Sequence, residues 1–229
     1  MLTVDHVDQY YGSSHTLRNL CLELERGDCL CLMGRNGVGK TTLLNVIMGQ
    51  LPIRSGSLTL DSEDLSRARP DQRARTGLGY VPQGRMIFPL LTVAENLRVP
   101  LLATGGSMVP DYLFELFPIL QTMAHRRGGD LSGGQQQQLA IARALVLEPK
   151  VLLLDEPCEG IQPNLVTEIG SIVQRLNQEL GLTVLLVEQR LAFARRVANR
   201  FALMDRGAKV AEGMIDDLSE SLVQQYLTV

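Results

Sequence analysis

Hydrophobic and polar residues follow two patterns in the first sixty positions of the chain. Apolar and polar residues alternate over 2–11, 19–25 and 55–60, which predicts three strands of a sheet with one wet face. The unbroken apolar run 29–33 instead predicts a strand buried on both faces. Together these patterns predict an antiparallel sheet beside a parallel core.

Helical spacing of apolar residues dominates the middle of the chain. The segment 79–83 predicts a strand that ends at a proline, and 95–123 predicts helices interrupted at 104–107 and at Pro110. A long helix is predicted to follow Ser132 and to run through Leu147. The middle of the chain is therefore expected to be helical.

The last third of the chain alternates again between strands and helices. The apolar runs 151–154 and 183–187 predict buried parallel strands, and the helical spacing from 165 to 180 between them ends at Gly181. A hairpin is predicted over 201–212. The apolar positions of a predicted terminal helix are Leu218, Leu222 and Tyr226. This alternation predicts a doubly wound α/β fold.

Composition limits the class of protein. With 229 residues, 45% of them hydrophobic, the chain can bury a large core as one domain or as a core with a lobe attached. The net charge of −3 gives no cationic field, so no nucleic-acid partner is expected. No apolar run approaches the roughly 18 residues of a membrane span, and the chain does not open on a basic signal sequence, so we expect a cytoplasmic protein. The cysteines show no metal-binding spacing and are predicted to be reduced core residues: Cys21, Cys29, Cys31 and Cys158.

The segment 34–42 predicts a phosphate-binding loop. Its glycines allow backbone N–H groups to point into one concavity, Lys40 adds a positive charge, and the Thr41 hydroxyl stands where a Mg²⁺ ligand is needed. A buried strand precedes the loop and a helix follows it, the order that such a loop requires. The predicted nucleotide-binding residues of this loop are Gly34, Arg35, Asn36, Gly37, Val38, Gly39, Lys40, Thr41 and Thr42.

Two later segments are candidates for the same chemistry. Asp155 and Glu156 follow a fully apolar strand, where one could hold Mg²⁺ and the other orient a water; alternatively they are solvated residues at a strand end. Ser132, with the glycines after it, could bind an anion at a helix N-terminus. Taken alone, such a segment more often simply begins an ordinary capped helix.

These motifs, in this order, resemble the nucleotide-binding subunit of an ATP-binding-cassette (ABC) transporter. The segments that carry the resemblance are 34–42, Gln83, Leu131–Gln135 and Leu152–Pro157, and it extends over nearly the whole chain. It implies a P-loop NTPase core with a parallel sheet, an antiparallel β subdomain and an inserted helical subdomain. The expected domain is 1–229, with 84–147 as the helical insertion.

Further segments resemble the importers of branched-chain amino acids and of urea, with the urea type most similar. They are Tyr80–Arg85, Gln135–Gln138, Glu159–Pro163 and Val187–Gln189. The resemblance implies an ATPase that powers such an importer from the inner face of the membrane. A soluble ABC ATPase acting as a cytosolic scaffold or assembly factor is the alternative. A third interpretation, a small-molecule kinase on the same phosphate-loop scaffold, does not explain the Ser-Gly-Gly-Gln element.

The resemblance also implies roles for individual residues. Tyr11 would stack on adenine, although it could simply be a packed turn tyrosine. The implied metal set is Thr41, Gln83 and Asp155, with Glu156 and Gln189 as catalytic residues. The signature residues, which would meet the ATP of a second subunit, are Ser132, Gly133, Gly134 and Gln135.

Two positions depart from the family pattern. Gln189 stands where a histidine usually contacts the γ-phosphate, and Gln162 stands where an aspartate usually crosses the dimer interface. The implied ligands are ATP and Mg²⁺. The implied partners are a second ATPase subunit, expected to be a related chain rather than a copy, two membrane permease subunits and an external solute-binding protein.

Overall fold

The computed structural model describes residues 1–103, 105–106 and 108–228. The predicted helix break at 104–107 includes Thr104 and Ser107, which lie outside the described residues. Among the described residues, no helix combines the length and the apolar character needed to cross a membrane.

Two sheets form the framework, as predicted. The antiparallel sheet has the strand order β2-β1-β4-β5. Its strands are β1 (Leu2–Tyr11), β2 (Ser14–Leu24), β4 (Ser55–Leu60) and β5 (Glu63–Asp64). The larger sheet has the order β10-β9-β3-β8-β7-β6, and all of its neighbours are parallel except the β9–β10 hairpin. Its strands are β3 (Cys29–Met33), β6 (Leu78–Val81), β7 (Val151–Asp155), β8 (Thr183–Val187), β9 (Arg200–Asp205) and β10 (Ala208–Met214).

The larger sheet separates two hydrophobic cores. Leu30 and Leu32 of β3 face one core, which includes helix α1 (Lys40–Ile47) and the inner face of the antiparallel sheet. Cys29 and Cys31 face the other core, which includes the helices on the opposite side. Strands buried on both faces therefore need apolar residues at consecutive positions, which explains the unbroken runs in the sequence.

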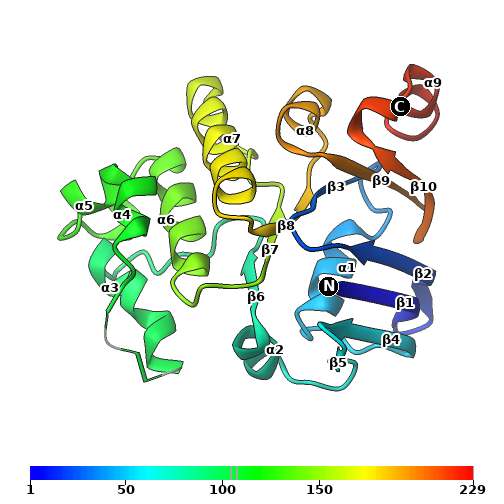
Figure 1. Cartoon of the computed structure of the whole chain (residues 1–229), viewed down its shortest axis with the longest axis horizontal. Coiled ribbons are helices and arrows are strands. Elements are labelled where there is room, and N and C mark those ends of the chain that lie inside the picture. The colour runs from blue at the N-terminus through cyan, green and yellow to red at the C-terminus, as the bar shows by residue number, and fades with distance from the viewer. Residues whose placement is uncertain (104, 107, 229) are drawn as a thin grey trace.

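Several of the helices gather at one end of the molecule and others cover the larger sheet (Figure 1). Those at one end of the molecule, opposite the antiparallel sheet, are α3 (Val93–Arg98), α4 (Tyr112–Leu116), α5 (Pro118–Thr122) and α6 (Gly133–Leu145), with the short 3₁₀ turns Val99–Ala103 and Gly128–Asp130 among them. Helices α7 (Pro163–Gln178) and α8 (Leu191–Val197) cover the larger sheet on the α6 side, and the turn Ile215–Asp217 leads into α9 (Glu220–Tyr226). The segment 84–147, predicted to be a helical insertion, contains no β-strand among its described residues.

Helix α2 (Pro70–Thr76) was missed by the hydrophobic pattern, for a physical reason. The buried residue of α2 is Arg73. Its guanidinium donates hydrogen bonds to the carbonyl groups of Val46 (2.6 Å) and Ile47 (2.8 Å), at the C-terminal end of α1. A cation stabilises the C-terminal end of a helix. The side chain that α2 packs against α1 is therefore a charged one.

Some sequence predictions need correction. Helix α6 ends at Leu145, before the predicted Leu147. Helix α7 ends at Gln178, and Leu180 lies beyond it with 54% of its surface exposed. Leu218 is buried but precedes α9. Cys21 is not a core residue, because it lies partly exposed on β2, whereas Cys29, Cys31 and Cys158 are buried.

Candidate active site

The loop between β3 and α1 has the backbone that a phosphate cradle requires. Gly34, Gly37 and Gly39 have φ angles of 153°, 80° and 109°, which side chains rarely allow. At Gly34, an added Cβ would also lie 2.4 Å from the carbonyl oxygen of Met204. The glycine pattern is therefore required by the conformation of the loop and by close contact with β9.

Lys40 begins α1 and lies over the loop. Its Nζ donates to the carbonyl oxygens of Gly34 (2.8 Å) and Arg35 (2.9 Å), and the side chain is buried. Burial lowers the pKa of Lys40, while the nearby carboxyl groups of Glu156 and Asp155 act in the opposite direction. The Arg35 guanidinium donates a hydrogen bond to the Thr228 carbonyl.

Asp155 ends β7 beside the start of α1. Its Oδ1 accepts a hydrogen bond from the Thr41 hydroxyl (3.3 Å), and the residue is 1% exposed. Burial raises the pKa of Asp155 to about 6. Its Oδ2 is buried without a hydrogen-bond partner among the described residues. A buried carboxylate oxygen without a donor, next to a hydroxyl group, suits a hard cation such as Mg²⁺.

Glu156 and Gln189 are joined to the glycine loop by hydrogen bonds. The Gln189 amide Nε2 donates to Glu156 Oε1 (2.6 Å) and to Asn36 Oδ1 (2.7 Å). Glu156 has a left-handed backbone (φ 47°), and its N–H donates to the Val187 carbonyl of β8 (2.9 Å). The ends of β7 and β8 thus place the acid and the amide opposite the loop.

Sequence reasoning left two acidic residues without a role. The Gln83 amide donates to Glu159 Oε2 (2.9 Å), although these residues are 76 positions apart in the chain. Glu188 is buried, and its Oε1 accepts hydrogen bonds from the backbone N–H groups of Gln189 (2.8 Å) and Arg190 (3.0 Å). Glu188 therefore fixes the turn that presents Gln189. Only the tertiary structure shows either contact.

These residues surround a pocket of about 400 Å³. The residues that line it are Asn36, Gly37, Gly39, Lys40, Thr41, Thr42, Gln83, Glu156, Glu159 and Gln189. The pocket combines backbone donors and a cation on one wall with carboxyl and amide groups on the other. That arrangement can hold a polyphosphate and orient a water molecule against it.

The remaining predicted residues do not line this pocket. Tyr11 ends β1 with 49% of its surface exposed. Val38 packs against the core that contains α1. Ser132 is exposed and caps α6, where its Oγ accepts a hydrogen bond from the Gln135 N–H (3.4 Å). Within one chain, therefore, the segment Ser132–Gln135 is not part of the pocket wall.

Known proteins are similar to this chain in sequence and in structure. A family model described as ABC transporter matches residues 17–159. The high-affinity branched-chain amino acid transport ATP-binding protein BraG of Pseudomonas aeruginosa is 39% identical over 90% of each chain. The glutamine transport ATP-binding protein GlnQ of Escherichia coli is 34% identical over 99% of this chain and 98% of its own. The cassette MJ0796, solved as a dimer bound to ADP and Pi, has a TM-score of 0.83 at 27% identity, covering 94% of this chain and 99% of its own.

Proposed function

The chain belongs to the ABC transporter family, and from this premise we propose that it is the ATP-hydrolysing subunit of an importer for branched-chain amino acids or urea. The observation that carries the proposal is the pocket in which Lys40, Glu156 and Gln189 meet the glycine loop. Amino-acid import is supported by the relatives BraG and GlnQ. Urea import is supported by the sequence motifs alone.

The glycine loop and Lys40 bind the phosphates of ATP in this proposal. The backbone N–H groups supply donors without side-chain charge, and Lys40 exchanges its bonds to the loop carbonyls for bonds to phosphate oxygens. Tyr11, half-exposed at the end of β1, stacks on the adenine ring.

Thr41, Gln83 and Asp155 are the residues that would hold Mg²⁺, which neutralises the charge of the phosphates when bound. Glu156 orients the attacking water and accepts its proton. Gln189 already contacts Glu156 and, as a neutral donor, holds this carboxylate in place. The Gln83 Nε2 donates a hydrogen bond to Glu159, which leaves the Gln83 Oε1 as the atom that would bind Mg²⁺.

The pocket is completed by a second ATPase subunit. The exposed Ser132 and the N–H groups at the start of α6 meet the ATP held by the partner, and the partner's equivalent segment meets the ATP held here. We propose a related chain as this partner, with two permease subunits and an external solute-binding protein. The chain then acts at the inner face of the membrane.

The helical region, 84–147, is the part proposed to contact the permease. Its early segment, 84–101, carries Met86 and Leu90 with 67% and 79% of their surfaces exposed. Exposed apolar side chains close together are suited to a protein partner. Co-expression with candidate permease subunits should bring the chain into the detergent-solubilised membrane fraction, and a scaffold ATPase would stay outside it.

Two substitutions test the catalytic assignment. Lys40→Ala should abolish ATP binding, because it removes the buried cation of the loop. Glu156→Gln should bind ATP but lower turnover by about 10²–10⁴-fold, the range for loss of a general base. Nucleotide binding and phosphate release are measured on the same preparations. A Glu156→Gln variant that turns over ATP like the wild type would rule out the catalytic role of Glu156.

The substrate is tested separately from ATP hydrolysis. The importer is reconstituted in vesicles with its permeases and binding protein, and uptake of labelled leucine and labelled urea is compared. Uptake of one solute, dependent on Glu156, identifies the substrate. Uptake of neither solute, with ATP hydrolysis intact, would reject both proposed substrates and leave the ATPase assignment standing.

A further inference from the structure

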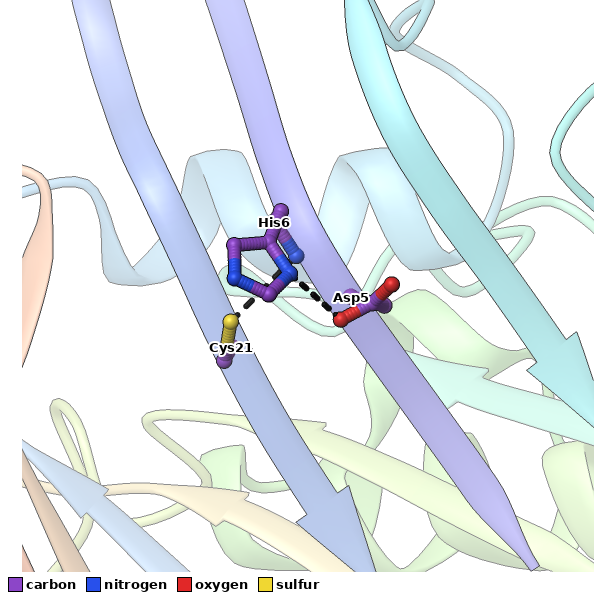
Figure 2. Close-up of side chains that lie close together, drawn as sticks. All are labelled: Asp5, His6 and Cys21. Atoms are coloured by element: carbon purple, nitrogen blue, oxygen red, sulfur yellow. Dashed lines mark hydrogen bonds and ion pairs between the residues drawn. The ribbon is translucent and has the colours of Figure 1, made fainter.

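Three potential metal ligands lie together on the outer face of the antiparallel sheet. They belong to β1, which ends at Tyr11, and to the next strand, β2. Asp5 and His6 are neighbours on β1, and Cys21 lies on the adjacent strand β2 (Figure 2). One ligand atom from each residue lies within 4.8 Å of the other two. None of the three residues belongs to the nucleotide pocket.

A β-bulge brings these residues to one side of the sheet. Val4 pairs with Leu22 and Val7 with Leu20, so the two residues of β1 between them oppose the single residue Cys21. Consecutive residues of a regular strand point to opposite faces, but a bulge changes this alternation. Asp5 and His6 are accordingly both exposed.

The neighbouring strand β4 fits the bulge. His6 has a left-handed backbone with φ of 48°. On β4, Gly56 lies so close that an added Cβ would be 2.4 Å from the carbonyl oxygens of both Asp5 and His6. The bulge is therefore packed against a position where only glycine fits, which holds the backbone of Asp5 and His6 in place.

His6 already contacts both of the other residues, one through its side chain and the other through its backbone. The Nδ1 atom of His6 lies 2.6 Å from Asp5 Oδ1, and the backbone N–H of His6 donates to Cys21 Sγ (3.3 Å). Zn²⁺ binds histidine nitrogen, carboxylate oxygen and cysteine sulfur at about 2.0–2.3 Å, so ligand atoms around one ion lie some 3–4 Å apart. Small rotations of these exposed side chains reach that spacing.

We propose that Asp5, His6 and Cys21 form a binding site for a divalent transition metal of the zinc class. A thiolate and an imidazole select zinc over magnesium or calcium, which prefer oxygen ligands alone. Three protein ligands leave a fourth position for water. The exposed side chains of Asp5 (57%) and His6 (64%) make this a site that exchanges its ion with solvent.

A bound ion would join β1 to β2 through their side chains. These strands form the hairpin whose turn begins at Tyr11, the residue proposed to stack on adenine. The site would then stabilise the part of the molecule that carries the adenine contact. This consequence rests on the proposed function, whereas the metal site itself does not.

Cobalt(II) is the probe, because its thiolate complexes give a charge-transfer absorption that oxygen ligands do not. The full chain, without a histidine tag and without nucleotide, is titrated with Co²⁺ in the presence of excess Mg²⁺, and Zn²⁺ is then added. We expect a thiolate-to-cobalt band that saturates at one equivalent and disappears with Zn²⁺. Absence of the band would overturn the proposal.

Three variants identify the ligands. Cys21→Ser and Asp5→Asn are close in shape to the native residues, and His6→Asn suits the left-handed backbone at that position. Each substitution should weaken Co²⁺ binding by at least about 10–100-fold, the loss seen when a residue that only supports a metal ligand is removed. Cys21→Ser should also abolish the thiolate-to-cobalt band. His125→Asn, at an exposed histidine of the helical region, is the matched control and should bind like the wild type. Unchanged affinity in any of the three variants, with the fold verified by circular dichroism and thermal unfolding, would overturn the three-ligand site.

Discussion

At the scale of single residues, the end of β7, beside the start of α1, carries a carboxyl group whose charge is unfavourable there. Asp155 is 1% exposed, its pKa is raised to about 6 by burial, and its Oδ2 has no donor among the described residues. Burying a charge without a full set of partners destabilises a protein. Such a cost is common at functional sites, where a ligand later supplies the missing partner.

This cost predicts that Asp155→Asn stabilises the nucleotide-free protein. The folded-state pKa of Asp155 lies above the ordinary value of 3.8. Ionisation of this carboxyl group therefore lowers the stability of the folded protein as pH rises from about 4 to 6, and the full penalty applies above about pH 6. A shift of this size corresponds to about 2–3 kcal/mol. We expect the variant to be more stable than the wild type at pH 8 by roughly this amount, with the gain disappearing as pH falls towards 4.

Denaturant unfolding at several pH values measures the effect, and the variant should at the same time lose Mg²⁺-dependent ATP binding. Asp216→Asn, at an exposed carboxyl group, is the control and should change neither property. An Asp155→Asn variant that is less stable than the wild type at pH 8 would show that the carboxylate is well satisfied in the native protein.

At the scale of elements, two helices of the helical region begin in the same way but are predicted to differ in function. Thr92 caps α3 and Ser132 caps α6, each within a capping box. In α3 the third residue is Glu95, whose carboxylate accepts hydrogen bonds from the Thr92 N–H (2.7 Å) and hydroxyl (2.9 Å). In α6 the third residue is the neutral Gln135, so the N-terminus of α6 presents no anion of its own and remains open to a phosphate.

Substitution of each capping residue distinguishes a structural role from a role in ATP turnover. Thr92→Ala and Ser132→Ala should each destabilise the chain by about 0.5–2 kcal/mol, the ordinary cost of a lost cap. Ser132→Ala should in addition lower the ATP turnover of the assembled transporter, whereas Thr92→Ala should leave it close to the wild-type rate. Equal effects of the two substitutions on turnover would mean that Ser132 is only a structural cap.

At the scale of the whole molecule, the phosphate loop and the segment Ser132–Gln135 belong to different parts of the chain. The loop connects β3 of the larger sheet to α1, and α6 lies beside α3, α4 and α5 (Figure 1). The pocket around Lys40 is open and does not include Ser132. Under the proposed function, the segment Ser132–Gln135 of a second subunit completes this pocket.

This arrangement predicts the behaviour of the Glu156→Gln variant in solution. Because we expect a related chain as partner, the variant alone should remain a monomer with ATP and Mg²⁺. It should form a heterodimer when the related ATPase subunit is added, and ADP should not support pairing. Solution mass under the three conditions measures this. A homodimer with ATP alone would overturn the mixed pair and show that one chain supplies both halves.

Local patterns were sufficient for most of the fold. The strand over Cys29–Met33, the glycine loop and the apolar strand that ends at Asp155 were predicted where they occur, because each depends on adjacent residues: continuous burial, left-handed glycines, or a charge at a strand end. Helix α2 was not predicted, because its inward residue is Arg73, whose partners lie in α1. A hydrophobic pattern cannot indicate a buried side chain that is charged.

The sequence by itself determined the class of fold and the positions of most strands and helices, since these follow from local periodicity and motif spacing, and it predicted the residues that would surround the phosphates. Tertiary structure alone decided which residues touch. The contact of Gln83 with Glu159 and the bridge from Gln189 to Asn36 join positions far apart in the chain. The meeting of Asp5, His6 and Cys21 depends on strand register and a bulge. Such contacts are set by how the strands pair and pack, which no local stretch of sequence encodes.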